Sequence, residues 1–261
     1  MSPRNLRTYQ ATDIVGYYSQ IRLIQGAEKQ VIERLQAQLP QMRMLDMGVG
    51  GGRTTTCFAP LVKDYIGIDN SPPMIAACQQ RFSDWLPLDC FRVVDARDLS
   101  PFADNSFDFI LFSYNGLDFV SHAERVQVLQ EIQRVGKPGA YFCFSSHHLG
   151  GIERAFSFRE QLSFNPISVY LKVSMWGLLR LFNHQLNYQD LMNSEHVIVR
   201  DESHNFRLDT YYIRPAAQIV QLTPGFRDVE VYSWRTGEQL DAQAQSQNTD
   251  MWLYYLCQVA E

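Results

Sequence analysis

Residues 42–55 read MRMLDMGVGGGRTT, an apolar run that leads through an acidic residue into glycines. The acidic residue is Asp46, and the glycines are Gly48, Gly50, Gly51 and Gly52. Glycine loses more conformational freedom on folding than any other residue, so a cluster after a strand-like run calls for a physical cause. The backbone here either approaches a ligand closely or makes a tight turn between a strand and a helix.

Strand-like and helix-like segments alternate on the carboxyl side of this stretch. Strands are predicted at residues 42–48, 64–70, 90–99, 105–115 and 140–148. Helices are predicted between them at residues 53–61, 71–85 and 121–139. Strands with continuous apolar centres belong to parallel sheets that are covered on both faces. The alternation therefore predicts an open α/β sheet with helices on both sides.

Other segments flank this regular part. An apolar period near 3.6 residues predicts a helix over residues 12–39. Near the end, a helix is predicted at 215–222, a strand from Val229 and a closing strand at 251–260. The polar residues 241–249 are predicted to form a loop.

Residues 149–210 interrupt the alternation, and we expect them to form a helical cap within a single domain of residues 1–261. Asn165 and Pro166 mark a helix start, and the helix that follows has a broad apolar face. This face either packs on the core, or forms a lid over an apolar substrate, or lies on a membrane surface. For the membrane alternative, only Lys172 and Arg180 supply positive charge.

The composition narrows the class of partner. The chain has 261 residues and a formal net charge of −5, whereas a nucleic-acid surface usually carries a basic patch. Its five cysteines are an odd number without a CxxC pair, which fits reduced thiols better than a disulfide framework. The sequence shows neither a signal-peptide core nor a transmembrane stretch. We therefore expect a cytoplasmic protein that binds no nucleic acid and spans no membrane.

The spacing of the glycines at residues 48–52 can be compared with that of two known nucleotide-binding motifs. The dinucleotide fingerprint G-x-G-x-x-G needs a third glycine where this chain has Arg53, and no GK[ST] follows as a P-loop requires. Acidic residues instead end three consecutive predicted strands, namely Asp46, Asp69 and Asp95. A carboxylate at the second strand end is placed to accept hydrogen bonds from ribose hydroxyls. Three carboxylates suit a ligand with hydroxyls, an amine and a cationic end, and they would repel a pyrophosphate.

Together these features resemble the class I S-adenosylmethionine-dependent methyltransferases. The matching stretches are LDMGVGGGR (45–53), YIGIDNSPPMI (65–75), VVDARDL (93–99), FADNSFDFILFSYNGL (102–117) and RVGKPGAYFCFS (134–145). The resemblance covers residues 42–146 well and residues 211–232 loosely. It implies a Rossmann-like, doubly wound, mostly parallel seven-stranded sheet, S-adenosylmethionine as the cofactor, and methyl transfer as the activity.

The resemblance also implies how the first part of the site binds the cofactor. Gly48, Gly50 and Gly52 would let the backbone approach the methionine part and the ribose. Asp46 would help to hold the cationic amino group, directly or through water. Asp69 would accept hydrogen bonds from both ribose hydroxyls.

The resemblance assigns the adenine end of the cofactor to residues of the second and third matching stretches. Asn70 and Met74 would flank the adenine, since a flexible thioether packs well on an aromatic face. Asp95 would accept a hydrogen bond from the adenine amine, and Ala96 would offer a backbone N–H. Ser113, at the end of the fourth predicted strand, completes the cofactor-binding set.

Two residues that follow strands are candidates for catalysis. Tyr114 lies in the stretch SYNG, and His147 lies in SSHH. A histidine near the acceptor could deprotonate a hydroxyl, but a histidine at a strand end can also be merely polar. Tyr114 either acts in catalysis or packs against the cofactor, and Tyr17 and Tyr18 either close over the cofactor or belong to the core. No cluster has metal-ligand spacing, so no metal is expected.

The sequence thus predicts methyl transfer to an oxygen or nitrogen of a small, partly apolar molecule, because the insertion is rich in aromatic residues. The fourth motif is SYNG rather than the NPPY type of many enzymes that methylate nucleic-acid bases or protein side chains. Three alternatives stay open: a peptide or RNA methyltransferase, a binding protein that uses the cofactor fold as a scaffold, and a NAD-dependent enzyme, which Arg53 disfavours.

Overall fold

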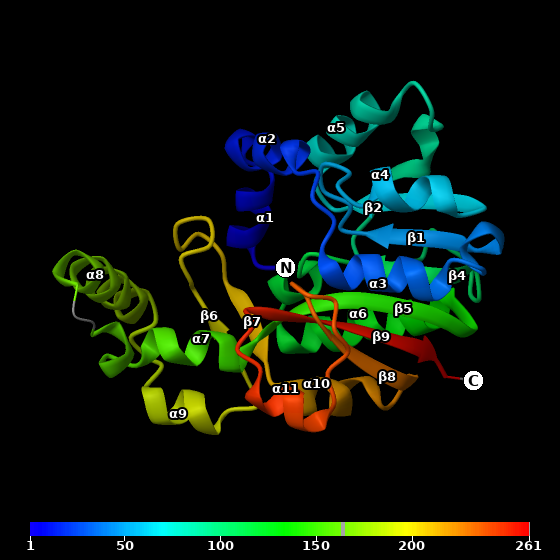
Figure 1. Cartoon of the computed structure of the whole chain (residues 1–261). Coiled ribbons are helices and arrows are strands. Elements are labelled where there is room, and N and C mark those ends of the chain that lie inside the picture. Colours follow the sequence, from blue (N-terminus) through cyan, green and yellow to red (C-terminus); the bar gives the residue numbers. More distant parts are fainter. Residues whose placement is uncertain (163–164, 261) are drawn as a thin grey trace.

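The computed structural model describes residues 1–162 and 165–260, and these form a nine-stranded sheet with helices on both faces (Figure 1). The strands are β1 (Arg43–Met47), β2 (Asp64–Asp69), β3 (Phe91–Val93), β4 (Phe107–Phe112), β5 (Gly136–His148), β6 (His196–Val199), β7 (Thr210–Ile213), β8 (Phe226–Ser233) and β9 (Trp252–Val259). The α-helices are α1 (Pro3–Tyr9), α2 (Thr12–Gln20), α3 (Gly26–Leu35), α4 (Thr55–Phe58), α5 (Pro72–Phe82), α6 (His122–Val135), α7 (Leu149–Phe156), α8 (Pro166–Phe182), α9 (Tyr188–Asn193), α10 (Pro215–Leu222) and α11 (Ala242–Gln247).

Seven of these strands form the sheet that the sequence predicts. Strands β3, β2, β1, β4 and β5 are parallel neighbours in that order, β9 is antiparallel to β5, and β8 is antiparallel to β9. Only β9 therefore runs against the others, and the Rossmann-like α/β fold is confirmed. The hairpin of β6 and β7 was not predicted. It pairs with the last two residues of β5, His147 and His148.

Two separate apolar cores show that the sheet is covered on both faces. One core packs α6 and α10 against the sheet, with Val128 and Leu222 fully buried. The other packs α3 and α5 against the opposite face, with Val31, Leu35 and Cys78 buried. Each core removes a large apolar area from water, and this burial is the dominant force that holds the helices on the sheet.

The amino-terminal segment differs from the single helix predicted over residues 12–39. Helix α2 ends at Gln20, and α3 begins at Gly26 behind a capping box formed by Gln25 and Glu28. The break brings Gly26 against the β8–β9 loop, where its N–H donates to the carbonyl of Trp234. A Cβ at Gly26 would lie 2.5 Å from the carbonyl oxygen of Arg235, so only glycine permits this close approach.

Two short helices also escaped sequence analysis. Helix α1 begins behind Ser2, whose side chain accepts the N–H of Asn5. Residues 241–249, expected to form a loop, contain α11, which Asp241 caps by accepting the N–H of Ala244. Helices this short and polar contain too few apolar residues to show a period of 3.6, so their sequences do not indicate a helix.

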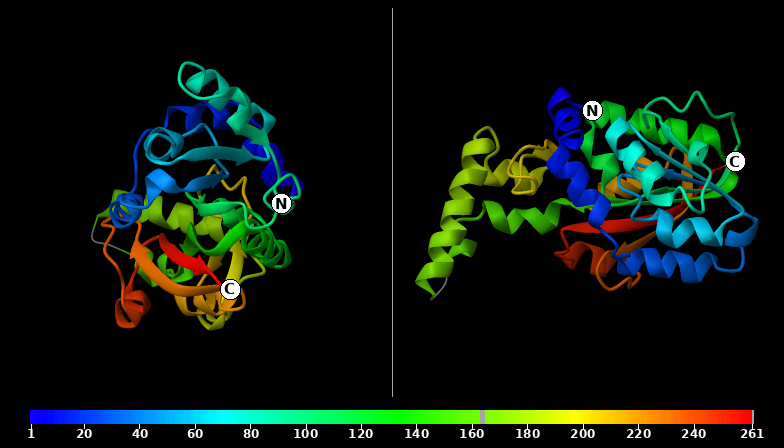
Figure 2. Two further views of the ribbon diagram at one scale, coloured as in Figure 1. Left: turned by 90° about the vertical axis from the view of Figure 1, so that its right-hand side faces the viewer. Right: turned by 90° about the horizontal axis from the view of Figure 1, so that it is seen from above.

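The insertion of residues 149–210 is mostly helical, as expected, but it also holds β6. Helix α8 begins at Pro166 behind the cap Asn165, as predicted. A small third core, in which Ile152, Leu179 and Val199 are buried, holds the insertion together. Figures 1 and 2 show α8 standing away from the sheet, at the far end of the insertion.

Two glycines with the same backbone conformation, one in the loop after β1 and one in β5, separate the effect of packing from that of backbone strain. Gly52 has φ +78°, and a Cβ there would lie 2.2 Å from the buried ring of Phe82; Gly139 has the same φ with nothing within 4 Å. We expect Gly139→Ala to lower the free energy of unfolding by about 1 kcal/mol through backbone strain. Gly52→Ala should cost about 2–3 kcal/mol, because overpacking adds to that strain. Urea denaturation of both variants measures the difference, and equal losses would contradict this role for Gly52.

Candidate functional site

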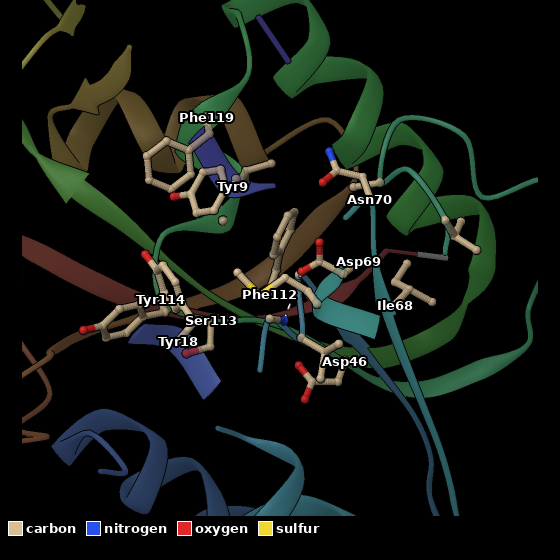
Figure 3. A pocket seen from close by; sticks show the side chains of 18 of the residues that line it. Tyr9, Tyr18, Asp46, Ile68, Asp69, Asn70, Phe112, Ser113, Tyr114 and Phe119 are labelled. Carbon is tan, nitrogen blue, oxygen red and sulfur yellow. Dashed lines mark hydrogen bonds between the residues drawn. The ribbon is translucent and has the colours of Figure 1, made fainter. Parts of the chain in front are cut away.

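A cavity lies at the carboxyl ends of β1, β2, β3 and β4, where parallel α/β sheets bind ligands (Figure 3). Most of the predicted site residues line it: Asp46, Gly48, Gly50, Asp69, Asn70, Met74, Asp95, Ala96, Ser113 and Tyr114. Gly52 and His147 are absent from the lining. The structure therefore brings ten of the twelve predicted residues together at one cavity, and their roles in binding remain predictions.

Asp69 ends β2 with its carboxylate held in place by backbone. Its two oxygens accept the N–H of Gly50 at 3.0 Å and the N–H of Ser71 at 2.8 Å. Burial raises the pKa of Asp69 to about 6, although the backbone hydrogen bonds oppose this shift. Each carboxylate oxygen can accept more than one hydrogen bond, so the group retains acceptor capacity toward the cavity.

Asp46 ends β1 and is almost fully buried. One of its oxygens accepts from the hydroxyls of Thr54 at 2.5 Å and Tyr65 at 2.6 Å. Burial raises the pKa of Asp46 to about 6, against the effect of both hydroxyls. Among the described residues both hydrogen bonds are accepted by Oδ2 of Asp46, so Oδ1 is available to a cation in the cavity.

The glycines of the loop after β1, residues 48–52, are required for different physical reasons. Gly48 and Gly50 adopt φ values of +61° and +54° and line the cavity. At Gly50 a Cβ would meet nothing closer than 4.0 Å, so its open side faces space that a ligand can fill. Gly51 instead lets α2 approach, since a Cβ there would lie 2.5 Å from the Cα of Ser19. The prediction that Gly52 approaches the ligand needs correction, because the packing of Phe82 requires that glycine.

Asp95 lines the cavity but is already engaged. Arg97 donates to both of its oxygens, at 3.0 and 2.7 Å, and also bonds Glu124. Burial alone would raise the pKa of Asp95, but the hydrogen bonds from Arg97 lower it below the usual value. The amino group of Met1 binds Glu124 at 2.7 Å, so the start of the chain also lies at this end of the cavity. An adenine amine would have to share Asp95 with Arg97.

The turn after β4 is strained where it meets the cavity. Tyr114 and Asn115 are consecutive non-glycine residues with φ +58° and +64°. Residues outside glycine rarely adopt this conformation, and clusters of such strain are found at functional sites. The Tyr114 ring stacks under the guanidinium of Arg53, 4.9 Å away. Ser113 lines the cavity, but its hydroxyl bonds Glu28, Arg53 and Tyr254 in the protein interior.

His147 lies one layer behind the cavity wall, with its ring next to that of Phe119, which does line the cavity. Its Nδ1 lies 2.8 Å from a carboxylate oxygen of the fully buried Asp118. Asp118 is in turn held by Arg125 and by the hydroxyl of Ser146. A carboxylate that accepts Nδ1–H leaves Nε2 as the basic nitrogen.

The structure adds residues that sequence reasoning missed. Tyr9 from α1 and Phe119 line the cavity and meet edge to face, with ring centroids 5.1 Å apart. Figure 3 shows the rings of Tyr9, Tyr18 and Phe119 on the side opposite Asp69. Tyr18 therefore lies over the cavity, one of the two alternatives considered. Nothing in the sequence connects the short helix α1 with this wall.

A buried ion pair supports the glycine loop from below. Arg53 donates to both carboxylate oxygens of Glu28, at 2.7 and 2.6 Å, and Glu28 is fully buried. Burial alone would raise the pKa of Glu28, but the charge and hydrogen bonds of Arg53 hold it below the usual value. One sequence signal was available: Glu28 shares a helical face with the apolar residues Val31 and Leu35.

Comparison with known proteins agrees with the geometry. The family model described as "Methyltransferase domain" matches residues 45–144, the span from β1 to β5 that carries the cavity. Residues 45–144 therefore match a methyltransferase domain, and solved S-adenosylmethionine-dependent methyltransferases share the fold of the chain. The matched family is one of methyltransferases, and a solved neighbour that shares the fold is a complex with S-adenosyl-L-homocysteine.

Individual relatives fit the methyltransferase domain. The demethylmenaquinone methyltransferase of Renibacterium salmoninarum is 37% identical over 101 residues, which are 39% of each protein. The CcbJ methyltransferase of Streptomyces caelestis has a TM-score of 0.62 at 15% identity, over 97% of this chain and 98% of that chain. The N-methyltransferase NodS of Bradyrhizobium japonicum, in complex with S-adenosyl-L-homocysteine, has a TM-score of 0.53 at 15% identity, over 97% and 99%.

The identity and the coverage of these matches limit what they show about this chain. At 15% identity the two structures show that the fold is shared. The chain spans between 23% and 52% of the length of the curated relatives that it matches. The acceptor and the activity of the whole protein are therefore inferred below from the site itself.

The residues of the methyltransferase domain fit the cofactor chemically. Asp69 offers acceptor oxygens to ribose hydroxyls, and Asp46 offers a buried carboxylate to an ammonium group. Gly50 leaves open space beside both, and Met74 supplies an apolar surface for a flat ring. The departure is Asp95, whose carboxylate is paired with Arg97.

Proposed function

We propose that the protein transfers a methyl group from S-adenosylmethionine to an oxygen or nitrogen of a small, partly apolar molecule. The observation that carries this proposal is the composition of the cavity. Carboxylates line its cofactor side, whereas the aromatic residues Tyr9, Tyr18, Tyr114 and Phe119 line the other side. Such rings bind apolar skeletons and supply few hydrogen bonds, so they favour an acceptor that is itself largely apolar.

The relatives support this class of acceptor. The name of the relative from Renibacterium salmoninarum identifies a demethylmenaquinone as its substrate. The acidic net charge of the chain makes RNA a poor alternative. All five cysteines are free thiols, which fits the cytoplasmic location that we propose.

The chain's own residues would carry out the supporting steps. When bound, S-adenosylmethionine supplies an activated methyl group on a sulfonium sulfur. Asp46 would hold the amino group of the cofactor and Asp69 its ribose, which would orient the methyl group for in-line attack. Tyr9 and Tyr18 cover the cavity and exclude water. Nε2 of His147, whose ring Asp118 holds in place through Nδ1, would take the proton of an acceptor hydroxyl or amine that reaches between Phe119 and Tyr114.

The insertion contributes to the cover indirectly. None of its described residues lines the cavity. However, His204, in the loop between β6 and β7, contacts the hydroxyl of Tyr18 at 3.2 Å, and its ring lies next to those of Tyr9 and Tyr17. We propose that residues 149–210 act as a cap by bracing the helices that cover the cavity, rather than by closing α8 over it.

The first test is cofactor binding by Asp69→Ala. We expect this substitution to raise the Kd of S-adenosylmethionine and of S-adenosylhomocysteine about 100-fold, because two hydrogen bonds to a charged group are lost. Asp64→Ala is the matched control, since Asp64 begins the same strand, is exposed, and forms an ion pair only with Arg43. Isothermal titration calorimetry measures all three proteins.

Each result of this titration has a clear meaning. Binding that weakens only in Asp69→Ala supports the proposal and justifies a screen of acceptors. Binding of NAD in place of S-adenosylmethionine would overturn it. Failure to bind any of these ligands would favour a non-catalytic protein that uses the fold as a scaffold.

A further inference from the structure

Helix α8 presents an apolar face to solvent. Its outer face consists of Ile167, Tyr170, Leu171, Met175, Leu178 and Leu181, and each of these side chains is between 41% and 72% exposed. At 3.6 residues per turn, these six positions fall within about 140° of the helix circumference. Among the described residues of this arc only Ser174 is polar, and none is charged. A soluble protein rarely leaves so continuous an apolar face uncovered.

The opposite face of α8 explains why the outer face stays outside. Leu179 is buried in the small core of the insertion. The indole N–H of Trp176 donates to the carbonyl of Phe156 at 3.1 Å, and the ring lies 5.1 Å from that of Phe158. These contacts fix the rotation of the helix about its axis. Figure 2 shows that α8 projects away from the sheet, and at its carboxyl end the ring of Phe182 stacks on that of Phe206.

The charge around α8 is opposite to that of the whole chain. Residues 154–182 contain four positive residues, Arg154, Arg159, Lys172 and Arg180, and one negative residue, Glu160, whereas the chain has a net charge of −5. Within residues 1–162 and 165–260, no ion pair is formed by Arg154, Arg159 or Lys172. On the same projection Lys172 lies about 60° beyond the edge of the outer face, and Arg180 lies on the opposite side of α8, so the two cations of the helix belong to its polar side.

We propose that the outer face of α8 docks on the surface of an anionic lipid bilayer. Apolar side chains would enter the boundary between headgroups and acyl chains, and the cations of the polar side and of the neighbouring segment would attract the helix to the anionic headgroups. No described helix is long and apolar enough to cross a membrane, so α8 would lie on the bilayer. A second copy of the chain fits less well, because a twofold pairing of α8 would bring the same positive charges together.

Vesicle flotation of the full chain tests this proposal. We expect binding to vesicles of phosphatidylcholine and phosphatidylglycerol, with weaker binding to phosphatidylcholine alone and at high salt. The double variant Leu171→Glu/Leu178→Glu should bind at least about tenfold more weakly, because it removes two buried leucines from the contact. Val220→Glu is the matched control, since Val220 is 71% exposed on α10 and undergoes the same chemical change.

Measurements of stability, cofactor affinity and oligomeric state distinguish loss of membrane binding from unfolding and from dimer formation. All variants should retain their melting temperature and their affinity for S-adenosylmethionine, so this test is independent of the proposed methyl transfer. Wild-type protein that does not float with anionic vesicles would overturn the proposal. A dimer seen by sedimentation velocity, which the double variant dissociates without any vesicle binding, would overturn it in favour of a second copy of the chain.

Discussion

Replacement of His147 with asparagine is expected to lower kcat by about 10²–10⁴-fold, while the Kd of S-adenosylmethionine changes by less than about twofold. The imidazole lies behind the cavity wall with its Nδ1 at 2.8 Å from Asp118. Asp118 also accepts the backbone N–H of His147 at 2.6 Å, so it fixes both the position and the tautomer of the ring. Asparagine retains a polar side chain but has no basic nitrogen to take a proton.

The structure also suggests where the acceptor proton would be bound. Asn115 lies 3.4 Å from Nε2 of His147, and its buried Oδ1 has no hydrogen-bond partner among the described residues. With Nδ1–H donated to Asp118, Nε2 accepts from the Asn115 amide nitrogen at 3.4 Å; an arriving hydroxyl would replace that donor, and an amine, with two N–H groups, could donate to Nε2 and to Oδ1. Unsatisfied buried acceptors are uncommon in native proteins, so a ligand that satisfies one gains correspondingly.

The measurement needs an acceptor and a matched control. Transfer of label from tritiated S-adenosylmethionine to a panel of hydroquinones, phenols and amines identifies an acceptor for the kinetic comparison. His148→Asn is the control, because His148 is the next residue of β5 and is equally buried, but it has no carboxylate partner comparable with Asp118. If His147→Asn and His148→Asn have the same kcat as the wild type, His147 is not the base. A rise confined to KM would assign it to acceptor binding instead.

The parts of the site that follow from local sequence were predictable. Asp46 and Asp69 occupy strand ends because the apolar runs before them are buried strands, and strand ends in a parallel sheet share one edge. The glycines after β1 were equally readable, since φ values near +60° are costly for other residues.

The parts that depend on distant contacts were not predictable. The ring of Phe82 occupies the space that a side chain at Gly52 would need, and Arg97 forms an ion pair with Asp95. Tyr9 reaches the cavity from a helix of only seven residues. Phe82 and Tyr9 lie far along the chain from the residues that they contact, whereas Arg97 is only two residues from Asp95, in the same stretch VVDARDL, and the pattern does not show that the two side chains pair. The outward rotation of α8 likewise depends on Trp176 and Leu179, which a helical pattern alone cannot distinguish from its other apolar residues.

The buried pair of Arg53 and Glu28 should have the largest effect on stability. We expect Arg53→Met to lower the free energy of unfolding by about 3–5 kcal/mol, because Glu28 would keep a buried charge without its partner. Arg43→Met is the control: Arg43 pairs with Asp64 on the surface, and such exposed pairs contribute at most about 1 kcal/mol. Urea denaturation near neutral pH measures both losses, and equal losses would show that the buried pair has no special weight.

Two further comparisons separate charge from packing at this pair. The double variant Glu28→Gln/Arg53→Met should be more stable than Arg53→Met alone, since it removes the unpaired charge. The loss in Arg53→Met should also shrink as the pH falls. In the wild type the pKa of Glu28 lies below its usual value, so its contribution is present above that value and is lost as pH falls through the folded pKa. Without Arg53, burial raises the pKa instead, so protonation at low pH relieves the variant while it weakens the wild type. A loss that is independent of pH, and unchanged in the double variant, would attribute the effect to packing of the Arg53 side chain against Tyr114.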